Sequence, residues 1–418
     1  MFAPGSEDSV ADLGTDEPKT MWSRVNRQQW AGLWAILLVG AMALTGCSSD
    51  SGGSSTKAGP AGRTAAAVVP PKVTVTPADG TTKVRPDKPI RVAVADGTLS
   101  AVDVTTAAGA TVPGKISADQ RSWTSTKTLA PSAKYQVAVT SAAADGTSAK
   151  SSSSFRTLSP KSTASVSIQP RDDWKVGVGM PVIIDFSRSV KVKNRDAAEQ
   201  AVKVRTNAAL EGSWRWFSST QMQWRPKVYW PANTKVTVTT RLGSVELAPG
   251  VWGSANNRTE HFTVGNSMIS TVDVKKHTMT VRKNGKVLRV IPVTTGKPGY
   301  ASRNGVKVIM SRETSRQMDA ATTGTDPADS EYYNLNVKYA MRLTYSGEFL
   351  HQAEWSVASQ GVANVSHGCT GMSPTNAKWL FDRSKVGDVV IYKGSKRSLE
   401  WGNGYTAWDM SYSQWKSA

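Results

Sequence analysis

Short runs in which every second residue is hydrophobic dominate the chain from Val73 onward. The first of these runs place valines at positions 73 and 75, 92 and 94, and 102 and 104. Asp-Gly pairs at 79–80 and 96–97 separate them. A period of two is typical of half-buried antiparallel strands, and Asp-Gly is a turn signal. We therefore expect an immunoglobulin-like β-sandwich over residues 73–158.

The same pattern returns between residues 159 and 265, for example in Val182-Ile-Ile-Asp-Phe186. In both segments a tryptophan, Trp123 or Trp224, precedes a proline-containing turn that leads into another alternating run. Internal similarity of this kind indicates a duplicated module. The second segment is thus expected to form a second immunoglobulin-like domain.

Four tryptophans lie close together in the second segment, and two interpretations of them are open. Indole faces stack on sugars and could form a carbohydrate platform, but aromatic residues at alternating strand positions more often pack in a core. We expect packing for this set, which consists of Trp214, Trp216, Trp224 and Trp230.

A third segment, with a different composition, covers residues 266–394. Two alternating runs meet at Asn284-Gly285, a type I′ hairpin signal, and a helix is expected only near residues 374–385. Residues 395–418 carry Trp401, Trp408 and Trp415 and are expected to pack back on this third domain as a C-terminal subdomain. The predicted fold class is therefore mainly β, with one short helix.

An apolar run at residues 30–44 follows Arg24 and Arg27 and ends in Leu-Thr-Gly before Cys47. The run is short for a membrane span, and its order resembles a bacterial lipobox, in which the cysteine is lipidated after cleavage. We expect a signal peptide over residues 1–47, with an uncleaved signal anchor as the alternative.

Residues 1–20 are polar and acidic, so Met21 is an alternative start of the signal peptide. Residues 48–72 are rich in Ser, Gly, Ala and Pro and are expected to form a flexible linker. Whether the signal peptide is cleaved before a lipidated Cys47 or stays as a signal anchor, we expect the rest of the chain to lie outside the cytoplasm, tethered to the cell membrane.

The chain has 418 residues, 39% of them hydrophobic, and a net charge of +19. This length predicts several domains, and the apolar content excludes wholesale disorder. The positive charge favours anionic partners such as nucleic acid, anionic lipid or anionic wall polymer, unless it serves only solubility. Because secretion removes the chain from the cytoplasm, we assign the charge to wall polymers and not to nucleic acid.

Only two cysteines are present, so lipidation of Cys47 leaves Cys369 without a disulfide partner. His351 and His367 precede it, Gly368 lets substrate approach the backbone, and a helix signal follows. A nucleophilic thiol needs a neighbouring imidazole and N–H donors for the oxyanion. The commoner alternative for one cysteine is an inert buried thiol.

The stretch strongly resembles the catalytic domain of the L,D-transpeptidases, of the YkuD type, whose signature is a His, a gap of about fifteen residues, and Ser-His-Gly-Cys. Here His351 and residues 366–369 match it. The similarity covers residues 266–418, including Gly-Lys-Pro-Gly at 296–299 and Arg-Asn-Gly at 303–305. The two preceding domains resemble those of the actinobacterial lipoprotein members.

The resemblance implies a role for each matching residue. Cys369 would be the nucleophile and His351 its general base, with the backbone carbonyl of Gln352 orienting the imidazole. His367 and Gly368 would shape the acyl site, and the N–H groups around Gly368 and Cys369 would form the oxyanion hole.

Five further residues are implied to contact substrate. Tyr333 falls where the family has a lid tyrosine, Met310 and Trp355 would line the pocket, and Ser366 belongs to the motif. Gly371 stands where the family usually carries Asn or Arg, so this chain lacks a polar side chain there.

The implied reaction is ping-pong acyl transfer without metal or organic cofactor. Cys369 would cleave the bond between the diamino acid and D-Ala of a peptidoglycan tetrapeptide stem, and the amine of an acceptor stem would resolve the thioester into a 3-3 cross-link. Carbapenem-type β-lactams are the expected inhibitors, and a monomer that reaches into the cell wall is the expected form.

Three alternatives stay open. An L,D-carboxypeptidase would let water resolve the thioester, and a non-catalytic lipoprotein would only bind wall polymers. A zinc site made of His351, His367 and Cys369 would use three protein ligands and an open position.

Overall fold

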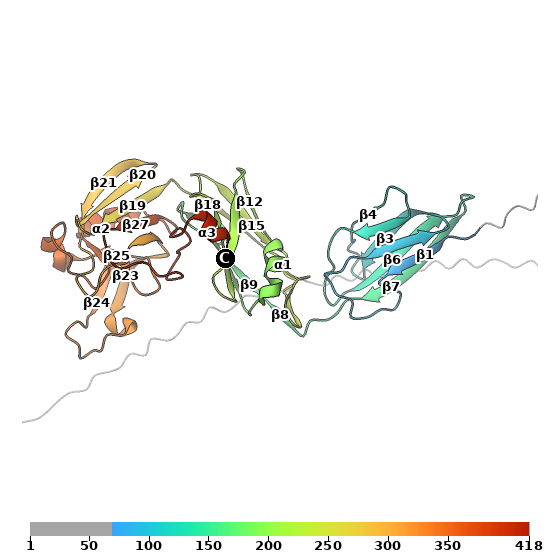
Figure 1. Cartoon of the computed structure of the whole chain (residues 1–418), viewed down its shortest axis with the longest axis horizontal. Coiled ribbons are helices and arrows are strands. Elements are labelled where there is room, and N and C mark those ends of the chain that lie inside the picture. Colours follow the sequence, from blue (N-terminus) through green and yellow to red (C-terminus); the bar gives the residue numbers. More distant parts are fainter. Residues whose placement is uncertain (1–68, 418) are drawn as a thin grey trace, which may run out of the picture. The chain divides into compact units, whose positions relative to one another are not determined.

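The computed structural model describes residues 69–417, which form three consecutive β-rich domains (Figure 1). The predicted signal peptide, the lipidation site Cys47 and the linker up to residue 68 lie outside the described residues. Within the described range, no helix combines the length and apolarity that a membrane crossing requires.

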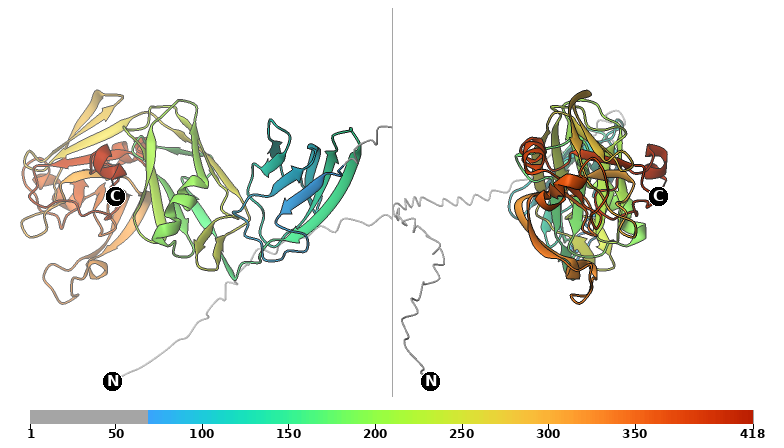
Figure 2. Two further views of the ribbon diagram at one scale, coloured as in Figure 1. Left: turned by 45° about the vertical axis from the view of Figure 1, so that its right-hand side comes forward. Right: turned by 90° about the vertical axis from the view of Figure 1, so that its left-hand side faces the viewer.

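The first domain contains two antiparallel sheets, in the strand orders β1-β2-β5-β4 and β3-β6-β7 (Figures 1 and 2). Its strands are β1 (Lys72–Thr76), β2 (Arg91–Ala95), β3 (Thr98–Thr106), β4 (Gly114–Ile116), β5 (Ser122–Ser125), β6 (Lys134–Ala142) and β7 (Ser148–Arg156). Residues of both sheets, including Trp123 and Tyr135, share one buried core. The alternating valines therefore point inward, as a two-layer sandwich requires.

The second domain has two four-stranded sheets, in the orders β13-β14-β11-β9 and β10-β18-β15-β12. The first comprises β9 (Val166–Gln169), β11 (Val182–Phe186), β13 (Gly212–Trp216) and β14 (Gln221–Pro226). The second comprises β10 (Trp174–Val176), β12 (Val202–Thr206), β15 (Lys235–Thr240) and β18 (Arg258–Val264). Smaller elements are β8 (Ser162–Ala164), η1 (Val192–Asn194), α1 (Arg195–Gln200), β16 (Glu246–Ala248) and β17 (Val251–Gly253).

The four clustered tryptophans belong to the interior of this second domain. Trp224 and Trp230 are buried, with ring centroids 5.2 Å apart, and the indole N–H of Trp230 donates to the carbonyl oxygen of Met180 at 2.7 Å. Trp214 and Trp216 are half-buried against the same core. Packing, rather than a carbohydrate platform, accounts for them.

The third domain is built on two sheets. The first has the order β21-β20-β19-β27-β22 and comprises β19 (Met268–Asp273), β20 (Thr278–Lys283), β21 (Lys286–Pro292), β22 (Gly305–Val308) and β27 (Val389–Lys393). The second has the order β23-β24-β25-β26 and comprises β23 (Ser311–Asp319), β24 (Asn334–Arg342), β25 (Phe349–Gln352) and β26 (Thr370–Met372). Both sheets contribute to one buried cluster, which fixes the second sheet in place.

Local signals in this domain behave as predicted. Asn284 and Gly285 both adopt positive φ, of 49° and 82°, in the turn between β20 and β21. The helix α2 (Pro374–Arg383) begins with Pro374 at its first turn, and the side chain of Ser373 caps it by accepting from the N–H of Asn376. Leu380 anchors the helix in the core. Two short 3-10 helices are η2 (Ala320–Thr323) and η3 (Glu354–Ser359).

The C-terminal tail divides its contacts between two domains. Its first part contacts the third domain, where Asp409 Oδ1 accepts from the N–H of Val306 at 2.8 Å, and also the second domain, where the indole N–H of Trp408 donates to the carbonyl oxygen of Gly179. Its second part contains α3 (Tyr412–Lys416) and contacts the second domain, where the indole N–H of Trp415 donates to the carbonyl oxygen of Ser213 at 3.0 Å. The sequence pattern predicted packing on the third domain only.

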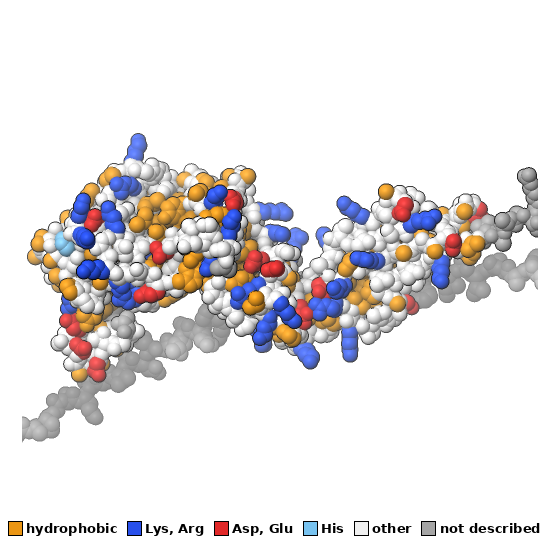
Figure 3. Space-filling model, viewed as in Figure 1, with side chains coloured by type: hydrophobic (Ala, Val, Ile, Leu, Met, Phe, Trp, Pro, Cys, Tyr) orange, Lys and Arg blue, Asp and Glu red, His pale blue; other side chains and the backbone are white. Residues whose placement is uncertain are grey.

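Positive side chains are spread over the visible face of all three domains and do not gather in one patch (Figure 3). Acidic side chains instead collect on the projecting loop between β23 and β24, which contains Asp326, Asp329 and Glu331. On this face, the net charge therefore marks no single anion-binding surface.

Candidate active site

Parallel pairing of β25 with β26 brings His351 and the Ser-His-Gly-Cys segment together. In this register Leu350 lies opposite Thr370, and His351 lies opposite Gly371. Cys369 immediately precedes β26 and thus lies beside the start of β25. The gap of about fifteen residues between His and the motif is the length of chain needed to form η3 and return to a parallel strand.

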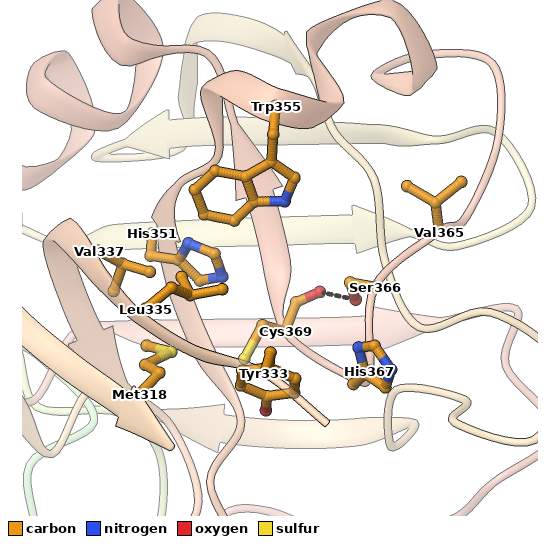
Figure 4. A pocket seen from close by; sticks show the side chains of 10 residues that line it. All are labelled: Met318, Tyr333, Leu335, Val337, His351, Trp355, Val365, Ser366, His367 and Cys369. Carbon is orange, nitrogen blue, oxygen red and sulfur yellow. Dashed lines mark hydrogen bonds between the residues drawn. The ribbon is translucent and has the colours of Figure 1, made fainter. Parts of the chain in front are cut away.

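His351 and Cys369 line the same cavity, whose volume is about 300 Å³ (Figure 4). The lining comes from β23, the loop between β23 and β24, β24, β25, η3 and the Cys369 segment, and consists of Met318, Tyr333, Leu335, Val337, His351, Trp355, Val365, Ser366, His367 and Cys369. Most of these side chains are apolar. The few polar groups of the cavity therefore lie in largely apolar surroundings.

The imidazole of His351 is buried and held in one orientation. Its Nδ1 lies 2.6 Å from the carbonyl oxygen of Gln352. Because a carbonyl oxygen only accepts, Nδ1 carries the proton and Nε2 is left as an acceptor. Burial lowers the pKa of His351, although the bond to Gln352 opposes this shift. The imidazole is therefore neutral at physiological pH, as a proton acceptor must be.

The thiol of Cys369 is equally buried. Desolvation raises its pKa to about 12, so the resting group is a thiol and not a thiolate. Sγ lies 3.5 Å from the carbonyl oxygen of Gly347. Ionisation of this thiol consequently depends on a base in the cavity.

Hydrogen bonds inside the segment hold its backbone rigidly. The Ser366 hydroxyl donates to the carbonyl oxygen of Cys369 at 2.6 Å and accepts from the N–H of Gly368 at 3.1 Å. The carbonyl oxygen of Gly368 accepts from the hydroxyl of Ser302 at 2.7 Å. Gly368 has a φ of 121°, which a residue with a Cβ rarely adopts. The Gly368 N–H, one of the expected oxyanion donors, is thus already bonded to Ser366.

His367 makes a hydrogen bond that the sequence did not suggest. Its Nε2 lies 2.6 Å from Glu331 Oε2, which also accepts from Lys297 Nζ at 2.5 Å. Hydrogen bonds from Lys297 and then His367 lower the pKa of Glu331. The rings of Tyr300 and Tyr333 lie 4.7 and 5.1 Å from that of His367. The one sequence signal was the Gly-Lys-Pro-Gly stretch that contains Lys297.

Two predicted pocket residues lie where the resemblance implied. Tyr333 lines the cavity, and burial raises its pKa to about 12, so its phenol can donate a hydrogen bond. Trp355 is 58% exposed at the rim, with its ring stacked on that of His351 at a centroid distance of 6.0 Å. The roles assigned to these residues stay predictions.

Met310 was wrongly predicted to line the cavity. It packs instead on the core cluster that contains Val308 and Tyr405, beside Gly404. Met318, at the far end of β23, lies in the cavity. Met310 precedes β23 and Met318 lies near its end, so the two side chains pack against different segments.

Gly371 was also predicted to contact substrate, but it does not line the cavity. It is buried in β26, and a Cβ atom at this position would lie 2.9 Å from both Ala353 Cβ and Thr294 Cγ2. These two side chains fill the space beside the β25–β26 pairing. The position therefore has no room for a larger residue in the present packing.

His351, His367 and Cys369 do not converge on a common point. His351 Nδ1 is bonded to Gln352, and His367 Nε2 is bonded to Glu331. Within residues 69–417, no group of three or more His, Cys, Asp or Glu side chains is placed to hold a metal ion. The zinc alternative thus gains no support from the geometry.

Comparison with known protein families and structures gives two matches to family models. A model described as a bacterial Ig domain matches residues 81–246, which span parts of both sandwiches. A model described as an L,D-transpeptidase catalytic domain matches residues 267–391, which include the cavity.

Curated relatives come from Mycobacterium tuberculosis. L,D-transpeptidase 2 is 34% identical over 395 residues, which cover 94% of this chain and 95% of the relative. L,D-transpeptidase 1 is 39% identical over 228 residues, which cover 54% of this chain and 84% of the relative. A solved structure of the L,D-transpeptidase LdtMt1 in complex with imipenem is 38% identical, covers 55% of this chain and 99% of that one, and has a TM-score of 0.48.

Proposed function

Because this chain belongs to the L,D-transpeptidase family, we propose that it forms 3-3 cross-links in peptidoglycan through a thioester on Cys369. The observation that carries this proposal is the pairing of two buried, neutral groups in one cavity. His351 has a free Nε2 because Gln352 occupies Nδ1, and Cys369 keeps its proton until a base removes it.

The first half-reaction is acylation. The Cys369 thiol gives its proton to His351 Nε2, and the thiolate attacks the carbonyl carbon between the third and fourth residues of the donor stem. The tetrahedral intermediate collapses when His351 returns the proton to the leaving amine of D-Ala. A thioester on Cys369 remains.

The second half-reaction regenerates the enzyme. The side-chain amine of an acceptor stem attacks the thioester carbonyl and loses its proton to His351, and Cys369 leaves as the thiol. An amide between two third residues is the product, and atoms balance without a metal or cofactor.

The proposal is tested by intact-mass spectrometry of the purified protein after incubation with a disaccharide-tetrapeptide or with a carbapenem. We expect a covalent adduct on Cys369 with either compound and a cross-linked dimer with the first. Cys369→Ala should give neither. An adduct with only tripeptide product would instead indicate an L,D-carboxypeptidase, and no adduct would support a wall-binding protein.

A matched pair of histidine variants tests the role of the base. His351→Ala should slow adduct formation by about 10²–10⁴-fold, the usual contribution of a general base. His261→Ala, an exposed histidine on β18, should leave the rate unchanged. Equal rates in both variants would remove His351 from the mechanism.

For the location of the enzyme, we propose a lipid anchor at Cys47, which rests on the sequence motif alone. Labelling of cells with an alkyne fatty acid should mark the wild-type protein and not Cys47→Ala. If the lipid tethers the protein to the membrane, Cys47→Ala should also appear in the culture medium. A Cys47→Ala protein that stays with the cells and is labelled as strongly as the wild type would contradict the lipobox interpretation.

A further inference from the structure

A cluster of buried charges lies directly behind the Cys369 segment. The side chain of Lys307 on β22 is fully buried, and that of Glu348 is 5% exposed. Glu348 Oε2 accepts from Lys307 Nζ, and Glu348 Oε1 accepts from the backbone N–H and Nη1 of Arg303 at 2.8 and 3.2 Å. Such charges are rarely buried unless they are paired.

Glu348 lies close to Gly368, the residue that precedes the nucleophile Cys369. It follows Gly347, whose carbonyl oxygen lies 3.5 Å from Cys369 Sγ. Its Oε1 also lies 3.9 Å from the position that a Cβ of Gly368 would occupy. A negative charge is thus fixed next to the residue before Cys369.

Lys307 is linked through Tyr392 to Thr370, the residue that follows the nucleophile. Its Nζ lies 3.6 Å from the ring centroid of Tyr392, and the phenol of Tyr392 bonds to the hydroxyl of Thr370 at 2.5 Å. Thr370 follows Cys369 in the chain. The ion pair therefore lies behind the residues on both sides of the nucleophile, although neither charged group lines the substrate cavity.

A stabilising role alone is a weak account of this pair. Desolvation of two charges offsets most of their attraction, and replacement of a buried ion pair by apolar residues is often neutral for stability. The interaction of each charge with Cys369 has, in contrast, a definite sign. A nearby cation favours a thiolate, and a nearby carboxylate disfavours it.

We propose that the buried Lys307–Glu348 pair controls how readily the Cys369 thiol becomes a thiolate, with Lys307 favouring ionisation and Glu348 opposing it. The two are positioning residues that act through Cys369, and the inference rests on the proposed nucleophilic role of that residue. The electrostatic contributions to the pKa of Cys369 have the same signs, because Glu348 raises it and Lys307 lowers it.

Other titratable groups face the thiol and must be held constant. On the cavity side they are His351, Tyr333 and His367, and behind the segment they are Arg303 and Tyr392. Only variants that change one charge behind the segment isolate the proposed effect.

The test is the rate of Cys369 alkylation by iodoacetamide as a function of pH, followed by intact mass on the full purified protein. Lys307→Met should shift the profile to higher pH, so alkylation at pH 7.5 should slow by about tenfold when the pKa of Cys369 rises by one. Glu348→Gln should shift the profile to lower pH and speed alkylation at pH 7.5. Lys286→Met, an exposed residue of β21, is the matched control and should change nothing.

Opposite shifts of the profile separate this proposal from a merely structural role. If both variants slow alkylation, or if either profile shifts in the reverse direction, the proposal is wrong. Should Lys307→Met fail to fold, the double variant Lys307→Met/Glu348→Gln restores a neutral pair, and its alkylation at pH 7.5 should be slower than that of Glu348→Gln.

The same experiment distinguishes this inference from the proposed function. Alkylation reports thiolate formation and requires no peptidoglycan substrate. Opposite shifts of the profile in a protein that forms no adduct with a tetrapeptide stem would sustain the inference and overturn the proposed reaction. An adduct on Cys369 with unchanged pH profiles would sustain the proposed reaction and overturn the inference.

Discussion

At the scale of single residues, His351 and Cys369 are both uncharged before the reaction begins. Burial lowers the pKa of the imidazole and raises that of the thiol to about 12. A neutral pair in an apolar cavity avoids the cost of desolvating two ions. The proton must then move as the substrate carbonyl arrives, when the developing charge can be stabilised.

The first prediction concerns the pH dependence of acylation. The base must be unprotonated, and the pKa of His351 is below its ordinary value because of burial. The acylation rate should therefore fall on the acid side only below about pH 6.5, the ordinary histidine pKa. Stopped-flow measurement of carbapenem acylation from acid to neutral pH checks this. An acylation rate that already falls at pH values well above the ordinary histidine pKa would contradict it.

The second prediction concerns Gly371. A Cβ atom there would lie 2.9 Å from Ala353 Cβ and Thr294 Cγ2, and both neighbours are buried. Gly371→Ala should lower the free energy of unfolding by about 1–3 kcal/mol through overpacking. Urea denaturation measures the loss. Thr294→Ser removes one of the two contacts, so adding it should recover part of the stability; no recovery would place the strain elsewhere.

At the scale of elements, the loop between β23 and β24 is tied to the Cys369 segment. Glu331 in this loop accepts from both His367 and Lys297, and Tyr333 packs near the His367 ring. The loop contributes Tyr333 to the cavity wall. Its position beside the cavity thus depends on an ion-pair contact between segments far apart in the sequence.

The third prediction concerns this contact. Glu331→Ala removes the acceptor shared by His367 and Lys297, so amide exchange over residues 320–333 should become faster and KM for the donor stem should rise. Hydrogen exchange and steady-state kinetics measure the two effects. Asp382→Ala, which breaks an exposed pair with Lys378 on α2, is the control and should change neither. Unchanged exchange in Glu331→Ala would show that the contact does not order the loop.

At the scale of the whole molecule, the C-terminal tail binds the second domain to the third. The guanidinium of Arg225, on β14 of the second domain, lies over the rings of Trp408, Tyr412 and Trp415 at 4.6 to 5.4 Å. The indole N–H of Trp408 donates to the carbonyl oxygen of Gly179 at 2.7 Å. The aromatic residues of the tail therefore fill an interface between domains.

The fourth prediction tests the tail. Trp415 is fully buried, so Trp415→Ala should lower the free energy of unfolding by about 3–5 kcal/mol, as expected for loss of a large core side chain. Urea or thermal unfolding measures it. Trp174→Ala, which changes a tryptophan that is 38% exposed, should cost much less. Equal losses of unfolding free energy in the two variants would mean that burial of Trp415 does not account for the contribution of the tail to stability.

The sequence alone determined the features that depend on neighbouring residues. Alternation of apolar and polar positions set the β-rich class and the two sandwiches, because strand side chains alternate between faces. Asn284-Gly285 specified its turn, because both residues tolerate positive φ. The motif that ends in Cys369 indicated the site, because its residue types suit acyl transfer.

Only the tertiary structure decided contacts between distant segments. Met318 rather than Met310 reaches the cavity, because the two side chains meet different segments of the folded chain. Glu331 meets His367, Lys307 meets Glu348, and the tail meets the second domain, because sheet register and domain packing set which segments become neighbours. No local pattern encodes those pairings, since each depends on the relative placement of two or more complete elements.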